Sequence, residues 1–273
     1  KPGTDVEGFL NAASAIFPFK SVEKQIRKGK NNIEKVHYKF TYDSPVLNKE
    51  FYILLDILFE ENHYERVVEK PISSEILITE EPLLKVTVPT VDCILGDKLT
   101  AFAPHTTGIE FDNDKDLEVI KQMYDIACLS EFWGNFEDIT KTYYSTAKAE
   151  IEYRGKDISA ADALRDTIES AACIAGRGKY GTEYEKYSAV MKNPTNHIYD
   201  GKFSGEIAAV LACKVMYIAA CVLKNKAPVK IENPESYLGE NISKSKFGKL
   251  SYLRKYNAEA FACLVEAIKL LEE

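Results

Sequence analysis

Three charged residues lie inside stretches whose other residues are apolar, and their types can support phosphate or metal chemistry. Lys98 lies in the segment DCILGDKLTAFAPHTTG, four residues after Ile94 and three after Leu95, on the apolar face of the helix predicted there. Asp56 interrupts the run FYILLDILF, and Asp125 interrupts MYDIACL. A charge in apolar surroundings is costly unless it is paired, hydrogen-bonded or used. Two acids and one base in such places indicate a site.

Lys98 and Asp125 are candidate partners. The stem of Lys98 can lie along the apolar stripe and bring its ammonium to a cleft, where it acts as a point charge for phosphate oxygens. Nearly every side of the turn around Asp125 is apolar, so we expect its partner to be a cation or a metal. Coupled to Lys98, Asp125 could orient the ammonium or accept a proton from an attacking hydroxyl. The alternatives are a surface lysine, or a purely structural pair of Lys98 with Asp97 or Asp125.

Asp56 and the loop after the Lys98 helix are the other candidates. On a strand, Asp56 can reach a divalent cation at the edge of a sheet, although it could also be a hydrogen-bonded acid at a strand end. The loop PHTTG at 104–108 offers backbone donors and the hydroxyls of Thr106 and Thr107, which could wrap phosphates or a base. The alternative is an ordinary helix-ending turn. His105 has no neighbouring histidine in the sequence and is not expected to bind metal.

Composition narrows the class of protein. The 273 residues are 45% hydrophobic and 28% charged, which is typical of a soluble globular chain. The longest apolar run, at 207–223, is broken by Lys214 and short for a bilayer, so we expect a buried helix and no membrane span. The six cysteines form no CxxC pair and are expected to be core residues in a reducing compartment, the cytoplasm.

The net charge of −7 argues against a generally cationic nucleic-acid binder, although local basic patches are possible. Basic residues gather at 20–30 and again at 244–255, where Phe247, Tyr252 and Tyr256 are interleaved with them. Positive charge with aromatic rings suits a nucleic-acid backbone and unstacked bases. A solvated helix face is the simpler interpretation of either cluster alone.

Hydrophobic patterning predicts a mixed first half and a helical second half. The first half is predicted to contain a helix at 6–17, a strand at 36–42, a second and more buried strand at 51–59, short strands at 65–68, 75–78 and 84–88, and the helices that carry Lys98 and Asp125. Thr90 or Asp92 can cap the Lys98 helix, and Pro104 ends it.

After Trp133 the strand patterns stop. Helices are predicted at 136–153, 158–176, 183–192, 203–224 and 251–272, with Asp157 or Ser159 capping the second of them. This change of pattern predicts an α/β domain at 1–132 and a helical domain at 133–273.

The segments that carry these residues resemble a known family. The stretch ILGDKLTAFAPHTTGI followed by EVIKQMYDIACL is similar to the two C-terminal motifs of the AbiE-type (AbiEii-like) toxin nucleotidyltransferases of type IV toxin–antitoxin systems. The strand FYILLDILF is similar to the strand that carries a metal-site acid in that family. The resemblance implies an α+β fold, with a polymerase-β-like mixed sheet and flanking helices followed by an all-helical C-terminal domain.

The same resemblance implies roles for the candidate residues. Lys98 matches the lysine that contacts nucleotide phosphates, Asp125 the aspartate needed for activity, and Asp56 the third carboxylate of the metal site. The implied reaction transfers a nucleoside monophosphate from an NTP to an acceptor hydroxyl, with Mg²⁺ as cofactor and RNA as the expected acceptor. The implied setting is toxin–antitoxin biology or phage defence, with a cognate antitoxin as partner.

Two other interpretations compete with an enzyme. One is a non-catalytic protein on the same scaffold that keeps Lys98 and Asp125 for nucleotide or partner recognition. The other is a helical interaction protein with a degenerate α/β cap. The first motif of the family, a Gly-Ser or Gly-Gly-Thr turn followed by paired acids, has no match here, since Gly3-Thr4-Asp5 lacks the acids. We expect those residues either upstream of Lys1 or lost, and a single acid cannot hold two metal ions.

Overall fold

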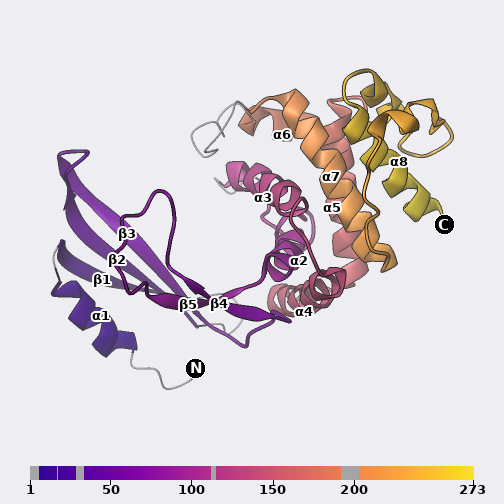
Figure 1. The fold of residues 1–273 in the computed structure, drawn as a ribbon. Coiled ribbons are helices and arrows are strands. Elements are labelled where there is room, and N and C mark those ends of the chain that lie inside the picture. Colours follow the sequence, from indigo (N-terminus) through magenta and orange to yellow (C-terminus); the bar gives the residue numbers. More distant parts are fainter. Residues whose placement is uncertain (1–5, 17, 29–33, 112–114, 192–202) are drawn as a thin grey trace. The chain divides into compact units, whose positions relative to one another are not determined.

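The computed structural model describes residues 6–16, 18–28, 34–111, 115–191 and 203–273. They belong to two compact units, Lys1–Asn62 and His63–Glu273 (Figure 1). The fold is mixed, with two small antiparallel sheets and many helices. The coarse prediction of helices combined with sheet is therefore confirmed.

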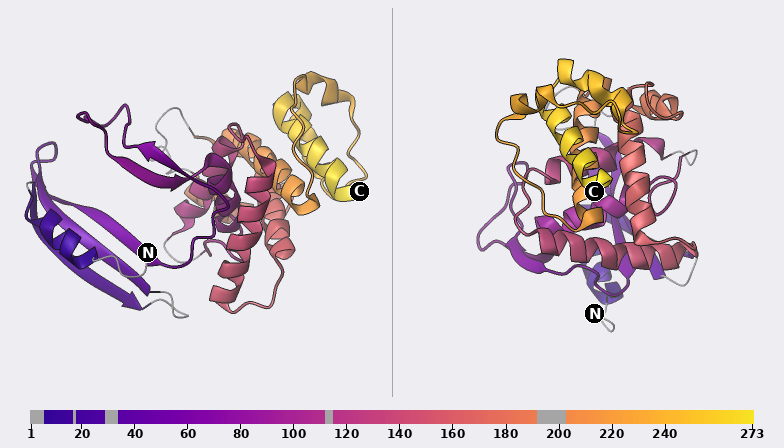
Figure 2. Two further views of the ribbon diagram at one scale, coloured as in Figure 1. Left: turned by 60° about the horizontal axis from the view of Figure 1, so that its bottom comes forward. Right: turned by 90° about the vertical axis from the view of Figure 1, so that its right-hand side faces the viewer.

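The first unit is a three-stranded antiparallel sheet with one helix on it. Its elements are α1 (Val6–Ser14), β1 (Phe19–Lys28), β2 (Glu34–Ser44) and β3 (Lys49–Phe59), with strand order β1-β2-β3. Leu10 of α1 packs against Val36, Tyr38 and Phe40 of β2, which alternate along the strand and so share one face (Figure 2). The alternation of residues along β2 in the sequence correctly predicted this strand.

Two predictions for the first unit are wrong. The simpler interpretation of the basic segment at 20–30 was a solvated helix face, but most of it forms β1, an edge strand whose Lys20 donates to Asp43 at 2.9 Å. Charged side chains suit an edge strand, where they discourage pairing with other chains, so they hid the strand pattern. Strand β3 was expected to be more buried, but it is the other edge strand, and its side chains are largely exposed.

The second unit begins with a two-stranded antiparallel sheet, β4 (Val67–Pro71) paired with β5 (Lys85–Pro89). The strand predicted at 75–78 is absent, because the backbone turns there, with Leu77 N donating to Ser74 O at 3.0 Å. Both described sheets are antiparallel throughout, so the predicted mixed sheet is wrong for the residues described. In the first sheet the connections between β1 and β2 and between β2 and β3 are too short for the crossover that a parallel pair needs.

Helices make up the rest of the second unit, and no strand follows Pro89 in the described residues. They are α2 (Val91–Ala101), α3 (Asp116–Leu129), α4 (Phe136–Arg154), α5 (Ala160–Gly176), α6 (Tyr184–Val190), α7 (Gly205–Lys224) and α8 (Ala258–Glu272), with 3-10 helices η2 (Pro234–Gly239) and η3 (Gly248–Lys255). Ser159 caps α5 in a reciprocal capping box with Asp162, as predicted. The helix predicted at 251–272 is instead η3 followed by α8, because Asn257 caps α8.

One core runs through the helices of the second unit. Helix α2 packs against α3, α4 and α5, and α3 packs against α7 (Figure 1). A Cβ on Gly96 of α2 would lie 2.4 Å from the carbonyl oxygen of Ile139 in α4, so glycine permits this close helix contact. Residue 132 lies inside this unit rather than at the junction between units. The division into domains 1–132 and 133–273 stays a prediction.

Helix α7 carries the longest apolar run. It is the one helix among the described residues that is long and apolar enough to cross a membrane by length and composition, and 67% of its apolar window is buried in the protein. Lys214, which interrupts the run, pairs with Glu131 and with Glu259 at 2.9 Å. These contacts are those of a core helix with a compensated charge.

Candidate active site

The structure brings Lys98 and Asp125 together. The Nζ atom of Lys98 lies 2.8 Å from Oδ2 of Asp125 and 2.8 Å from Oε1 of Gln122. The Lys98 side chain is 28% exposed and that of Asp125 is 42% exposed, so a ligand can reach both groups from solvent. Among the described residues Lys98 pairs with Asp125 rather than with Asp97, and a purely structural role for this pair stays open.

Helix α2 holds Lys98 in place through its buried face. Leu95 and Leu99, on either side of Lys98 along the helix, are fully buried in the core. The hydroxyl of Thr90 caps the first turn by accepting a backbone N–H, as predicted. At the other end, the N–H of Phe102 donates to the carbonyl of Lys98 at 3.2 Å and closes the last turn. The ammonium therefore extends from a backbone that is fixed at both ends.

Gln122 is a site residue that the sequence did not reveal. Gln122 and Asp125 are three residues apart on α3 and so lie on the same helix face, while Met123 and Ile126 are buried on the other. An ammonium has three N–H donors, of which described residues engage two. The third can bind the oxygen of a ligand. The sequence offered only the three-residue spacing between Gln122 and Asp125. This spacing points to Gln122 only after Asp125 is known to bind Lys98.

Asp97 points to a different partner although it is adjacent to Lys98 in the chain. The hydroxyl of Tyr64 donates to Oδ2 of Asp97 at 3.2 Å. Burial raises the pKa of Asp97, and the contact with Tyr64 and the charges of Lys98 and His63 counteract part of this effect. Asp97 therefore links Tyr64, near the start of the second unit, to α2. The ammonium of Lys98 contacts Asp125 and Gln122 of α3 instead.

The loop at 104–108 uses its hydroxyls inside the molecule. Thr107 is 1% exposed and donates to the carbonyl of Thr100 at 2.8 Å. Thr106 donates to Oδ2 of Asp166 in α5 at 2.8 Å. The Lys156 ammonium donates to the carbonyl of Thr106 at 2.6 Å. These contacts favour the helix-ending turn, and nucleotide binding by Thr106 and Thr107 stays an untested prediction.

His105 ties the same loop to two helices. Its Nδ1 lies 2.6 Å from Asp166 of α5, and its Nε2 lies 2.7 Å from Glu183 at the start of α6. Burial of the ring lowers the pKa of His105, but hydrogen bonds and charges of Asp166 and Glu183 outweigh burial and raise the pKa above its usual value of 6.5. Both ring nitrogens can then donate to carboxylates. His105 therefore has a structural use in the fold.

The His105 contacts predict a pH-dependent stability. Because the folded-state pKa is raised, the stabilisation is fully present below the unfolded value of 6.5 and is lost as pH rises through the folded pKa. Glu183 has a lowered pKa, so its share is present above 4.5 and lost as pH falls through its folded pKa. Thermal unfolding of His105→Gln should show the largest deficit, about 1 kcal/mol for a half-exposed charged hydrogen bond, between these two pH limits.

A matched substitution checks this pH effect. Ser188, on the neighbouring helix α6, is uncharged and donates to the carbonyl of Glu185, so Ser188→Ala should leave the pH profile close to wild type. If His105→Gln lowers the free energy of unfolding by the same amount at every pH, the packing of the His105 ring rather than its charge holds the loop in place.

Asp56 belongs to the first unit, and the Lys98–Asp125 pair to the second. It is opposite His37 in the β2–β3 register, and its Oδ1 contacts the Nδ1 of His37. In the part of the chain that the structure describes, no group of three or more His, Cys, Asp and Glu side chains could hold a metal ion. A lone carboxylate beside an imidazole does not suit Mg²⁺, which prefers oxygen ligands. The described residues therefore do not complete the implied Mg²⁺ site.

The basic cluster at 244–255 is largely used within the fold. Phe247 is buried, and Tyr252 donates to the carbonyl of Ala175 at 2.7 Å. Arg254 donates to the carbonyl of Glu240 at 2.9 Å. Only Tyr256 remains an exposed ring in this cluster, at 68% exposure. The cluster at 20–30 lies partly outside the described residues.

A comparison with protein families decides the assignment. The model of the nucleotidyl transferase AbiEii toxin of type IV toxin–antitoxin systems matches residues 5–188, more than half of the chain. The chain belongs to the AbiEii family. No match was found among curated proteins or among solved structures. The AbiEii match includes Asp56, Lys98 and Asp125 and ends within α6. AbiEii membership confirms the predicted resemblance, and it implies nucleotidyl transfer and a cognate antitoxin partner.

Proposed function

We propose that this AbiEii-family protein transfers a nucleoside monophosphate from an NTP to an acceptor hydroxyl, with RNA as the acceptor, in the cytoplasm. The observation that supports the proposal most strongly is the accessible Lys98–Asp125 pair, inside the family match, with one ammonium donor left for a phosphate oxygen. Asp125 and Gln122 orient the ammonium from one helix face. The antitoxin or phage-defence setting follows from the family.

The two charged groups have distinct tasks in the proposed reaction. Lys98 binds a phosphate oxygen of the NTP and offsets the charge that develops during transfer. The acceptor hydroxyl attacks the α-phosphorus, the new P–O bond forms, and the bond to pyrophosphate breaks. The hydroxyl proton goes to the carboxylate of Asp125. Because the described residues complete no Mg²⁺ site, we assign steps to Lys98 and Asp125 alone.

Label transfer tests the function. The protein is incubated with total RNA, magnesium and each NTP labelled at the α-phosphate or at the γ-phosphate. Nucleotidyl transfer predicts labelled RNA with an α-labelled NTP and none with the γ-labelled form. Label from the γ-position would indicate phosphoryl transfer and contradict the proposal. Failure of all four NTPs to label RNA, while NTP binding persists, would favour the second candidate.

The second candidate is a non-catalytic nucleotide-binding protein on the same scaffold. It is favoured by the surroundings of Asp56 within the first unit, where this carboxylate contacts the imidazole of His37. This candidate predicts NTP binding that depends on Lys98 and no transfer of label.

The phosphate contact predicts a loss of NTP affinity in Lys98→Gln. A charge-assisted hydrogen bond contributes about 1.5–3 kcal/mol, so the Kd for NTP should rise about tenfold to a hundredfold. The Kd of the corresponding nucleoside, which has no phosphate, should be unchanged. Isothermal titration calorimetry measures both.

Lys121→Gln is the matched control for this substitution. Lys121 lies on α3 and pairs with Glu118 at 2.9 Å, away from Lys98. Equal losses for the nucleoside and the NTP in Lys98→Gln would show that the lysine maintains the shape of the site rather than binding phosphate.

A further inference from the structure

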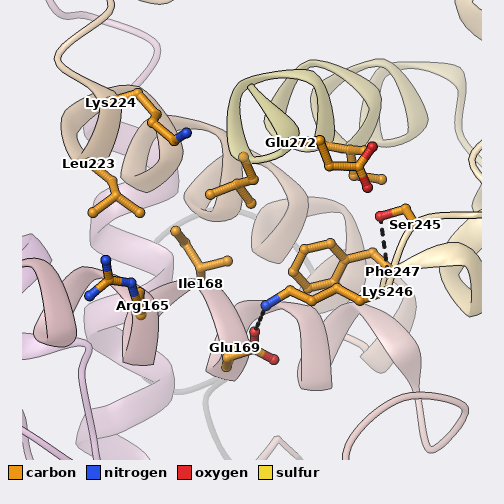
Figure 3. A pocket seen from close by; sticks show the side chains of 11 residues that line it. Arg165, Ile168, Glu169, Leu223, Lys224, Ser245, Lys246, Phe247 and Glu272 are labelled. Atoms are coloured by element: carbon orange, nitrogen blue, oxygen red, sulfur yellow. Dashed lines mark hydrogen bonds and ion pairs between the residues drawn. The ribbon is translucent and has the colours of Figure 1, made fainter.

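A cavity whose lining does not include Lys98 lies among helices of the second unit, with most of its lining residues beyond the family match. Its volume is about 760 Å³, and it is bounded by α5, the segment 245–247 and the last turns of α7 and α8 (Figure 3). Pockets that hold small ligands typically have volumes of about 300–1,000 Å³. Its apolar lining comes from Ile168, Leu223, Phe247, Ile268 and Leu271. A lining of this kind favours an apolar chain or ring.

Most of the charged side chains at the cavity are engaged in ion pairs. Lys246 is neutralised because it pairs with Glu169, which also accepts from the Tyr180 hydroxyl at 2.7 Å. Arg165 pairs with Asp162 at 2.8 Å, a neighbour on its own helix. Lys224 has no carboxylate within ion-pair distance among the described residues. The nearby Glu273 pairs with Lys226, which lowers the pKa of Glu273 together with the charge of Lys224. The Lys224 ammonium is therefore the charge most available to a ligand.

Two of the three cations lie at one end of the cavity, and the third, Lys246, lies between the ends beside Glu169. In Figure 3, Arg165 and Lys224 lie on one side with Leu223 between them, and Glu272 and Ser245 lie on the opposite side. Ile168 and Phe247 lie between the two ends. A ligand that places an apolar body over Ile168 and Phe247 would therefore bring an anionic group to Lys224 and Arg165.

We propose that this cavity binds a free amphiphilic anion, an apolar chain that carries one carboxylate or phosphate. The apolar body would remove the floor of the cavity from water, and the anion would pair with Lys224 and Arg165. The site lies largely beyond the residues that the AbiEii model matches, so it is separate from the Lys98 centre. Its test needs no transfer activity.

Calorimetry with decanoate, decyl phosphate and uncharged 1-decanol tests the site, each below its aggregation concentration. Both anions should bind saturably at one site, and decanol should bind more weakly. Lys224→Gln should raise the Kd for the anions about tenfold, as expected for losing one charged contact. Lys230→Gln, an 87% exposed lysine outside the cavity, is the matched control. Leu271→Trp adds bulk to the apolar lining and should abolish binding of all three.

The outcomes that overturn the site are specific. Absence of saturable binding by either anion would do so, as would equal losses in Lys224→Gln and Lys230→Gln. The remaining source of such a ligand is a membrane lipid. Cosedimentation with phosphatidylglycerol vesicles, without binding of dissolved decanoate or decyl phosphate, would overturn the assignment of a free ligand.

Discussion

Replacing Asp125 by asparagine is expected to lower the rate of nucleotidyl transfer by about a hundredfold or more, the usual contribution of a positioned general base. Asparagine keeps the size of the side chain and can still accept a hydrogen bond from Lys98. It cannot take the proton of the acceptor hydroxyl, and it leaves the ammonium without its counter-charge. The rate should therefore fall at saturating NTP, while the Kd for NTP changes little.

This substitution separates catalysis from folding. The Lys98–Asp125 pair is partly exposed, and such pairs contribute little to the free energy of unfolding, about 1 kcal/mol or less. Circular dichroism and thermal unfolding of Asp125→Asn should thus resemble wild type. Glu118→Gln, which removes another carboxylate from α3, is the matched control for the rate. A variant that unfolds, or one that keeps its full rate, would assign Asp125 to a structural pair.

Replacing Gly96 by alanine is expected to destabilise the second unit by about 2–3 kcal/mol, the upper part of the range for overpacking a core. The added Cβ would lie 2.4 Å from the carbonyl oxygen of Ile139 and 3.0 Å from the backbone nitrogen of Tyr143. Both are backbone atoms of α4 and cannot rotate away. Helix α2 would have to move from α4 and would carry Lys98 with it, so transfer should fall as well.

Chemical denaturation measures this effect, with Gly239→Ala as the control. A Cβ at Gly239 meets no atom within 4 Å, and its conformation is open to alanine. Gly239→Ala should therefore leave the free energy of unfolding near that of wild type. Equal stabilities of the two variants would contradict the close packing of α2 on α4.

Local sequence patterns predicted much of the fold and the central pair of the site. The apolar spacing around Lys98 and Asp125 located α2 and α3, and the cost of a buried charge predicted that the two side chains would meet. Helix caps at Thr90 and Ser159 depend on neighbouring residues and were also predictable. Most of these features depend on residues that are close together in the chain.

Contacts between residues that are far apart in the chain could not be predicted from the sequence. Gln122 could not be predicted as a site residue, because its role depends on the contact between its side chain on α3 and Lys98 on α2. The carboxylate of Asp166, sixty residues or more from Thr106 and His105, uses the very groups that the sequence offered to a nucleotide. Strand β1 was not predicted because it is an edge strand rich in lysine, which obscures the alternation of apolar and polar residues. Tertiary pairing decided each of these three cases.

A double-mutant cycle on the transfer rate tests most directly whether Lys98 and Asp125 form one working centre. The rates of wild type, Lys98→Gln, Asp125→Asn and the double variant are compared by α-label transfer under identical conditions. Residues that act as a unit show strongly non-additive losses. The structure predicts that the double variant is about as slow as the slower single variant. Losses that multiply would mean that the two residues act independently and would contradict a shared Lys98–Asp125 centre.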